Sequence, residues 1–164
     1  TAVRIGAGAS EYPGEIDDLS DTYDVREWVD REAVEIHGLL IEPYKVNHPP
    51  STFGFRITGA DGEVLVYSGD TGICDEAVEL ARDADLFLCE ASWTHAPGLR
   101  PEGLHLSGVE AGQIATRAGV RSLALTHVVP WTDSDAILDE ASGEYAGPLQ
   151  LVHQGQVIEV RKPI

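Results

Sequence analysis

Short apolar runs alternate along this chain with helix-like segments, and the connections between them are short. Strand-like runs cover residues 39–46, 53–57 and 63–67, and Gly59-Ala60-Asp61-Gly62 between the last two predicts a hairpin turn. Residues 1–35 are rich in glycine and acid, which favours loop in the front half and a short amphipathic helix over residues 25–35.

Beyond residue 70 the pattern becomes a regular alternation of helix and strand. Helices are expected over residues 76–82, 107–118 and 133–141, and strands over residues 86–89, 121–126, 149–153 and 156–160. Ser107-Gly108-Val109-Glu110 fits a capping box at a helix start, and Gly119 fits the helix stop. This alternation predicts an α/β layered fold, and we expect one domain over residues 1–164.

Composition limits the class of partner. The chain has 164 residues, with 11 basic and 28 acidic side chains and a formal charge of −17. Because proteins that grip nucleic acid backbones need a basic face, a long nucleic acid is a disfavoured partner. Two cysteines do not make a disulfide scaffold, and we find neither a membrane-spanning apolar run nor a basic-then-apolar leader. We therefore expect a cytoplasmic protein with no membrane partner.

Polar side chains stand at the ends of three predicted strands. Asp70 follows the run 64–67, Glu90 ends the run 86–89 and His127 ends the run 123–126. Ligand sites in open α/β sheets lie beyond the carboxyl ends of the strands. Gly69 and Gly72, which flank Asp70, allow the backbone to turn sharply there. The sequence therefore predicts a site at this edge of the sheet.

Each of these residues also has a structural explanation that the sequence leaves open. Asp70 can be the N-cap of the following helix, and His127 can be a half-buried histidine bonded to backbone. His48 can be a loop histidine, and His105 can simply precede a helix cap. The other histidines and the cysteines fit ordinary surface, strand-edge or packed positions: His37, His95, His153, Cys74 and Cys89.

Taken together and in order, the motifs resemble the metallo-β-lactamase superfamily, and within it ribonuclease Z and its relatives among bacterial phosphodiesterases. The resemblance runs from about Val46 to Val160. Its motifs are Asn47-His48-Pro49 with Phe53-Gly54-Phe55-Arg56-Ile57, Tyr67-Ser68-Gly69-Asp70-Thr71, Leu88-Cys89-Glu90-Ala91-Ser92, His105-Leu106-Ser107 and Leu125-Thr126-His127.

The resemblance implies an αββα sandwich that carries two divalent metal ions, usually zinc, with manganese or iron as alternatives. It implies that His48 and His127 each bind one metal and that Asp70 bridges both. It further implies that His105 protonates the leaving oxygen and that Glu90 orients His105. A carboxylate can bridge two cations, and neutral imidazoles suit Zn²⁺.

Three departures from the family pattern shape the expectation. The His-x-His-x-Asp-His cluster that normally precedes His48 is absent from the sequence, which also contains no methionine. We therefore expect the chain to be the C-terminal portion of a metallo-β-lactamase-fold domain. Cys89 occupies a position that is usually histidine in ribonuclease Z. Asp70 follows His48 by only 22 positions, which leaves no room for a long tRNA-binding arm.

The resulting expectation is a metal-dependent phosphodiesterase for a small phosphodiester such as a cyclic nucleotide, in which metal-bound hydroxide attacks phosphorus. The first alternative is a tRNA 3′-end endonuclease like ribonuclease Z, and the second is a non-catalytic half-domain that serves binding. Thioester or lactam hydrolysis on the same fold stays open. Because many relatives are homodimers, we expect a homodimer.

Overall fold

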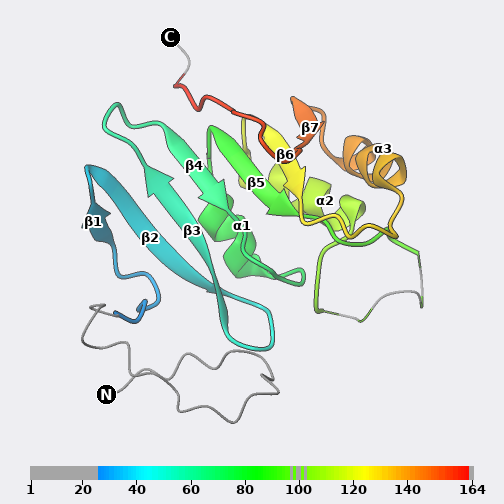
Figure 1. The fold of residues 1–164 in the computed structure, drawn as a ribbon, viewed down its shortest axis with the longest axis horizontal. Coiled ribbons are helices and arrows are strands. Elements are labelled where there is room, and N and C mark those ends of the chain that lie inside the picture. The colour runs from blue at the N-terminus through cyan, green and yellow to red at the C-terminus, as the bar shows by residue number, and fades with distance from the viewer. Residues whose placement is uncertain (1–25, 97, 99–100, 102, 163–164) are drawn as a thin grey trace.

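The computed structural model describes residues 26–96, 98, 101 and 103–162, and the loop predicted for the first residues lies largely outside them. The strands form one seven-stranded sheet in which each strand pairs with its neighbours in chain order (Figure 1). Strands β1 to β4 are antiparallel, and β4 to β7 are parallel. The strands are β1 (Val34–Ile36), β2 (Leu39–Val46), β3 (Thr52–Thr58), β4 (Val64–Tyr67), β5 (Leu86–Glu90), β6 (Leu123–Thr126) and β7 (Leu149–Leu151), and the helices are α1 (Asp75–Ala81), α2 (Gly108–Ala118) and α3 (Ser134–Glu144).

The helices cover one face of the sheet. Helix α1 packs on β2 and β3, α2 packs on β5 and β6, and α3 packs on α2 (Figure 1). Val66, Phe87 and Leu123 lie side by side on β4, β5 and β6 and are completely buried. Burial of apolar area at about 25 cal/mol per Å² makes this row a main source of stability. The alternating pattern in the sequence therefore builds the α/β layering that it predicts.

Helix α2 is fixed by the local signals found in the sequence. The Ser107 hydroxyl accepts a hydrogen bond from the Glu110 N–H, and the Glu110 side chain accepts one from the Ser107 N–H at 2.9 Å. At the other end Gly119 adopts φ +67°, a left-handed conformation that glycine reaches without steric cost. The predicted capping box and helix stop are both confirmed.

The helix expected over residues 25–35 is wrong. Residues 34–36 form β1 instead, in which Val34 pairs with Ile41. The preceding segment is held along β2, because the Arg31 N–H donates to the Pro43 carbonyl at 2.7 Å. Pairing with an existing strand thus outweighs a weak amphipathic pattern.

The strand expected over residues 156–160 is also wrong, and the strand expected over residues 149–153 is present but shorter, as β7 over residues 149–151. A turn bonds the Gln156 N–H to the His153 carbonyl at 3.1 Å. The chain then leaves the sheet edge and runs back toward the β3–β4 side (Figure 1), with Val157 88% exposed. Without a partner strand, β-type residues do not form a ladder.

Among the helices of the described residues, none combines the length and the apolar character needed to cross a membrane.

Candidate metal and acid–base site

The parallel half of the sheet gathers the predicted site at one edge. Glu90 is the last residue of β5, Asp70 follows β4 by three positions and His127 directly follows β6. His48 lies in the β2–β3 connection, which reaches the same edge because β3 runs antiparallel to β4. Donor atoms of His48, Asp70 and His105 lie within 4.8 Å of one another, as do those of Glu90, His105 and His127. The structure therefore brings all five residues together.

Two glycines shape the loop that carries Asp70. Gly69 has φ +63°, and a Cβ there would lie 2.4 Å from the Phe53 carbonyl oxygen, closer than side chains tolerate. The N–H of Gly72 donates to the Asn47 carbonyl at 2.8 Å, which ties this loop to the segment before His48. The sharp backbone turn that the sequence predicted beside Asp70 is therefore present at Gly69.

His105 reaches the site through a short parallel bridge between Trp93 and Ser107. The Trp93 N–H donates to the Leu106 carbonyl at 3.2 Å, which lays the segment before α2 beside the segment after β5. The His105 ring then sits between two others, 5.1 Å from the His48 ring and 5.2 Å from the His127 ring between centroids. The three imidazoles form one cluster.

Glu90 is the buried centre of this arrangement. Its side chain is fully inaccessible to solvent. Oε1 accepts hydrogen bonds from the Thr71 N–H at 2.7 Å and from His105 Nδ1 at 2.8 Å. Oε2 accepts from the Ser92 hydroxyl at 3.0 Å and from the Leu106 N–H at 3.3 Å. Four donors on one carboxylate compensate for its loss of water, as a buried charge requires.

His127 is held in a strained backbone conformation. Its φ of +60° lies in the left-handed region, which costs roughly 1–2 kcal/mol for a residue other than glycine. The Ser92 hydroxyl lies 3.1 Å from the His127 carbonyl oxygen and 3.1 Å from its Nδ1. Nδ1 is also 3.4 Å from Asp70 Oδ1. Strain held by surrounding contacts is common at functional sites.

The alternative explanations are now decided for several residues. Asp70 is not a helix cap, because α1 begins at Asp75 with Cys74 as its N-cap. Cys89 is completely buried in the core, and Cys74 packs against that core, as predicted. Burial, together with the negative charge of Glu90, raises the pKa of the Cys89 thiol well above its ordinary value.

Sequence reasoning missed three hydroxyl residues in the site, Thr52, Thr71 and Ser92. Thr52 places its hydroxyl 3.3 Å from Nδ1 of His48, and Thr71 supplies the backbone N–H that binds Glu90. The sequence signal that could have indicated these residues is their spacing from the predicted site residues. Ser92 stands two residues after Glu90, and Thr52 stands four residues after His48. Hydroxyls at such spacings are too common in loops to single out from sequence alone.

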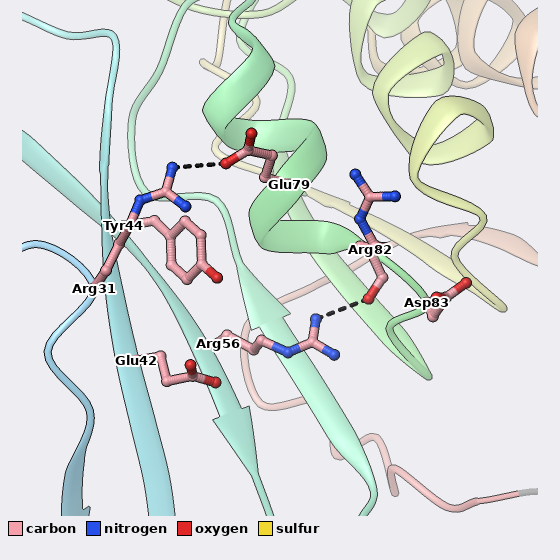
Figure 2. A pocket seen from close by; sticks show the side chains of 7 residues that line it. All are labelled: Arg31, Glu42, Tyr44, Arg56, Glu79, Arg82 and Asp83. Atoms are coloured by element: carbon pink, nitrogen blue, oxygen red, sulfur yellow. Dashed lines mark hydrogen bonds and ion pairs between the residues drawn. The ribbon is translucent and has the colours of Figure 1, made fainter.

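A pocket of about 400 Å³ lies elsewhere, beside the C-terminal end of α1 (Figure 2). Three arginines and three carboxylates line it together with Tyr44: Arg31, Arg56, Arg82, Glu42, Glu79 and Asp83. Arg31 binds Glu79 at 2.6 Å and stacks over Tyr44. Arg56 donates to the Leu80 and Arg82 carbonyls at 3.0 and 2.9 Å, which caps α1. Arg31, Glu79 and Arg56 are thus used in holding α1 against β2 and β3, which favours a structural role for this pocket.

The donor set at the sheet edge fits a divalent metal ion. Asp70 is half-buried, and its carboxylate lies 3.4 Å from His127 Nδ1 and within 4.8 Å of donor atoms of His48 and His105. His48 and Asp70 lie in one donor group with His105, and His127 lies in a second group with Glu90 and His105. His48, Asp70 and His127 supply the nitrogen and oxygen donors that Zn²⁺ accepts. Closing the shells of two ions takes more donors than these three residues offer.

Comparison with known proteins identifies the class. Residues 9–128 match the family model for the beta-lactamase superfamily domain. The chain therefore belongs to the metallo-β-lactamase superfamily, whose members are metal-dependent hydrolases and generally bind divalent metals. The metallo-β-lactamase fold protein YhfI from Bacillus subtilis superposes with a TM-score of 0.72 at 26% identity, over 79% of this chain and 53% of that one. The expected fold class is confirmed.

Particular relatives show which members of the superfamily this chain is similar to. An uncharacterized protein of Mycobacterium leprae is 54% identical over 163 residues, which cover 99% of this chain and 57% of the relative. A ribonuclease Z of Myxococcus xanthus is 37% identical over 102 residues, or 60% of this chain and 33% of that protein. The chain thus spans a little over half the length of the mycobacterial relative. Human tRNase Z, short form, shares the fold with a TM-score of 0.60 at 20% identity, over 79% of this chain and 46% of that one.

Proposed function

We propose that the protein is a metal-dependent phosphodiesterase for a small phosphodiester such as a cyclic nucleotide. The observation that carries this proposal is the 2.8 Å hydrogen bond between Glu90 Oε1 and His105 Nδ1, placed beside the donors of His48 and Asp70. An oriented imidazole next to metal donors is what cleavage of a P–O bond needs, because the leaving alkoxide is a poor leaving group until it is protonated.

Three side chains would serve as metal ligands: His48 for one ion, His127 for a second, and Asp70 between them. A bound divalent ion supplies Lewis acidity toward the phosphoryl oxygens and activates water at neutral pH. Asp70 supplies the negative charge of this set, and the two imidazoles complete it. The proposal therefore makes Asp70 essential for metal retention as well as for activity.

His105 is proposed as the proton donor. Because Nδ1 bonds to Glu90, Nε2 is the ring nitrogen left to face a substrate. In the imidazolium form Nε2–H gives its proton to the departing oxygen, and the buried Glu90 carboxylate stabilises the positive ring. Glu90 does not need to exchange a proton in this step, since its four hydrogen bonds hold it as an acceptor.

The preference for a small substrate rests on charge and chain length. The sequence carries a formal charge of −17, which opposes binding of a long polyanion. The interval from His48 to Asp70 is filled by β3, the hairpin and β4. The second candidate is a tRNA 3′-end endonuclease, which the similarity to the ribonuclease Z of Myxococcus xanthus favours.

A substrate panel with two variants tests the proposal. Zinc- or manganese-loaded protein would be assayed on a 2′,3′- and a 3′,5′-cyclic nucleotide, on bis(p-nitrophenyl) phosphate and on a precursor tRNA. His105→Ala should lower kcat by about 100-fold or more with metal content unchanged, since general acid catalysis contributes about 10²–10⁴-fold. Asp70→Ala should lose metal and activity together.

His153→Ala is the matched control, because His153 is exposed and follows the short edge strand β7. Full activity of His105→Ala on every diester would remove the proton-donor role. Cleavage of precursor tRNA alone, with steep salt dependence, would favour the endonuclease. Absence of metal from pure protein would favour the non-catalytic binding module.

A further inference from the structure

All three histidines of the site are held through the same ring atom. Nδ1 of His105 bonds to Glu90, Nδ1 of His127 lies 3.1 Å from the Ser92 hydroxyl, and Nδ1 of His48 lies 3.3 Å from the Thr52 hydroxyl. A hydroxyl can either donate to an imidazole nitrogen or accept from it, so the tautomer depends on where the hydroxyl sends its own proton.

At His127 the neighbours decide the direction. The Ser92 hydroxyl has one proton and contacts Glu90 Oε2 at 3.0 Å and the His127 carbonyl at 3.1 Å, both of which only accept. That proton goes to the Glu90 carboxylate, the charged and therefore stronger acceptor, so a lone pair of Ser92 faces Nδ1. Asp70 Oδ1 at 3.4 Å is likewise an acceptor. Nδ1 of His127 must therefore carry the hydrogen, which leaves the lone pair of the ring on Nε2.

The same argument holds at His48. The Thr52 hydroxyl donates to the Pro50 carbonyl at 3.0 Å, so its lone pairs are left to face His48 Nδ1. The Pro50 carbonyl oxygen also lies 3.4 Å from Nδ1 and can only accept. Both neighbours of Nδ1 are thus acceptors, and the lone pair of this ring is again on Nε2.

We propose that Ser92 and Thr52 are positioning residues that fix the Nδ1–H tautomers of His127 and His48 and leave Nε2 of each ring available to a metal ion. This inference rests on the proposed metal site. Ser92 is only 1% exposed and also bonds Glu90, so it links the ring of a proposed metal ligand to the carboxylate that holds the proposed proton donor. Partners of this kind orient metal-binding histidines and raise their affinity.

Zinc affinity, measured by chelator competition on the intact chain, tests the proposal directly. Ser92→Ala should weaken zinc binding by about 10–100-fold, and Ser92→Thr, which keeps a hydroxyl, should restore it to within about threefold of wild type. Thr52→Val and Thr52→Ser form the equivalent pair for His48. Ser122→Ala is the matched control. Ser122 directly precedes β6, at the opposite end of that strand from His127, and its hydroxyl donates to the Asp85 carbonyl. Far-UV circular dichroism confirms folding of each variant.

A second readout needs no metal. In chelator-treated chain labelled with ¹⁵N-histidine, the neutral rings of His127 and His48 should show a protonated Nδ1 and an unprotonated Nε2. In an Asp70→Ala background, which removes the carboxylate 3.4 Å from His127 Nδ1 and leaves only the more distant Glu90 Oε2 at 3.9 Å, adding Ser92→Ala should shift that ring toward the Nε2–H form.

The outcomes separate the two proposals. Wild-type zinc affinity in both Ser92→Ala and Thr52→Val, or an Nε2–H tautomer in the wild-type rings, overturns the positioning role. If wild-type chain binds no zinc, the proposed metal site fails. The ¹⁵N measurement then still decides whether the hydroxyls of Ser92 and Thr52 fix the tautomers of His127 and His48.

Discussion

Glu90 Oε1 accepts a hydrogen bond from His105 Nδ1 at 2.8 Å, and the two side chains differ sharply in exposure, 0% for Glu90 and 16% for His105. The Glu90 carboxylate is thus shielded from solvent and held by its hydrogen bonds, while the His105 ring is partly accessible to solvent. A charge-assisted bond in a low-dielectric surrounding is stronger than the same bond in water. This geometry prepares the His105 ring before any substrate arrives.

Replacing Glu90 by glutamine should damage both stability and turnover. The amide NH₂ would face a backbone N–H or the ring N–H where the carboxylate accepts four hydrogen bonds. An unsatisfied buried group costs about 1–3 kcal/mol, so the free energy of unfolding should fall by that amount in urea titrations. Glu76→Gln, at an exposed position of α1, should change it little. Unchanged stability of Glu90→Gln would contradict the hydrogen-bond assignment.

A methyl group at Gly69 should be far more damaging than one at Gly38. Both glycines have positive φ, +63° and +81°, and at each of them alanine costs about 1–2 kcal/mol for conformation alone. At Gly38 nothing lies within 4 Å of the added Cβ, whereas at Gly69 the Phe53 carbonyl oxygen lies 2.4 Å away. Thermal unfolding of the pair measures the steric part. Equal decreases in Tm for Gly69→Ala and Gly38→Ala would show that the loop before Asp70 adjusts to the added methyl group without a steric cost.

Zinc should stabilise the folded chain through Asp70. A ligand at 100 times its Kd adds about 2.7 kcal/mol, which corresponds to roughly 5–10 °C in Tm for a chain of this size. Differential scanning fluorimetry with and without zinc measures the shift. Asp70→Ala should abolish it, and Asp61→Ala, in the exposed hairpin, should retain it. A shift that survives in Asp70→Ala would mean that zinc binds elsewhere.

Stability should decline at alkaline pH because of Cys89. Burial first, and then the charge of Glu90, raises the pKa of the folded thiol, whereas the unfolded thiol titrates near its usual value of about 8.5. The contribution of this group is fully present below about pH 8.5 and is lost as pH rises toward the folded pKa, at up to about 1.4 kcal/mol per pH unit.

Urea unfolding under reducing conditions from about pH 7 to pH 10 measures this slope. Cys89→Ala should flatten the curve between about pH 8.5 and pH 10, while Cys74→Ala should keep the wild-type slope. Identical slopes in the two variants would show that Cys89 is not the responsible group.

The sequence was informative where the signals are local. Each of the strands β2 to β6 matches an apolar run, and the ends of α2 follow from the cap at Ser107 and the stop at Gly119. Sequence failed for β1 and for residues 156–160, where strand formation depends on whether a partner strand lies alongside. A weak periodic pattern does not contain that information.

The sequence by itself determined that Asp70, Glu90 and His127 stand at the strand ends, and the family resemblance gave each of them an expected role. Only the tertiary structure decided how the rings are held. Ser92 and His127 are 35 positions apart, and their hydroxyl–imidazole contact forms when β5 and β6 pair in parallel. The direction of a hydrogen bond depends on every donor and acceptor around it, and those neighbours come from segments that only folding brings together.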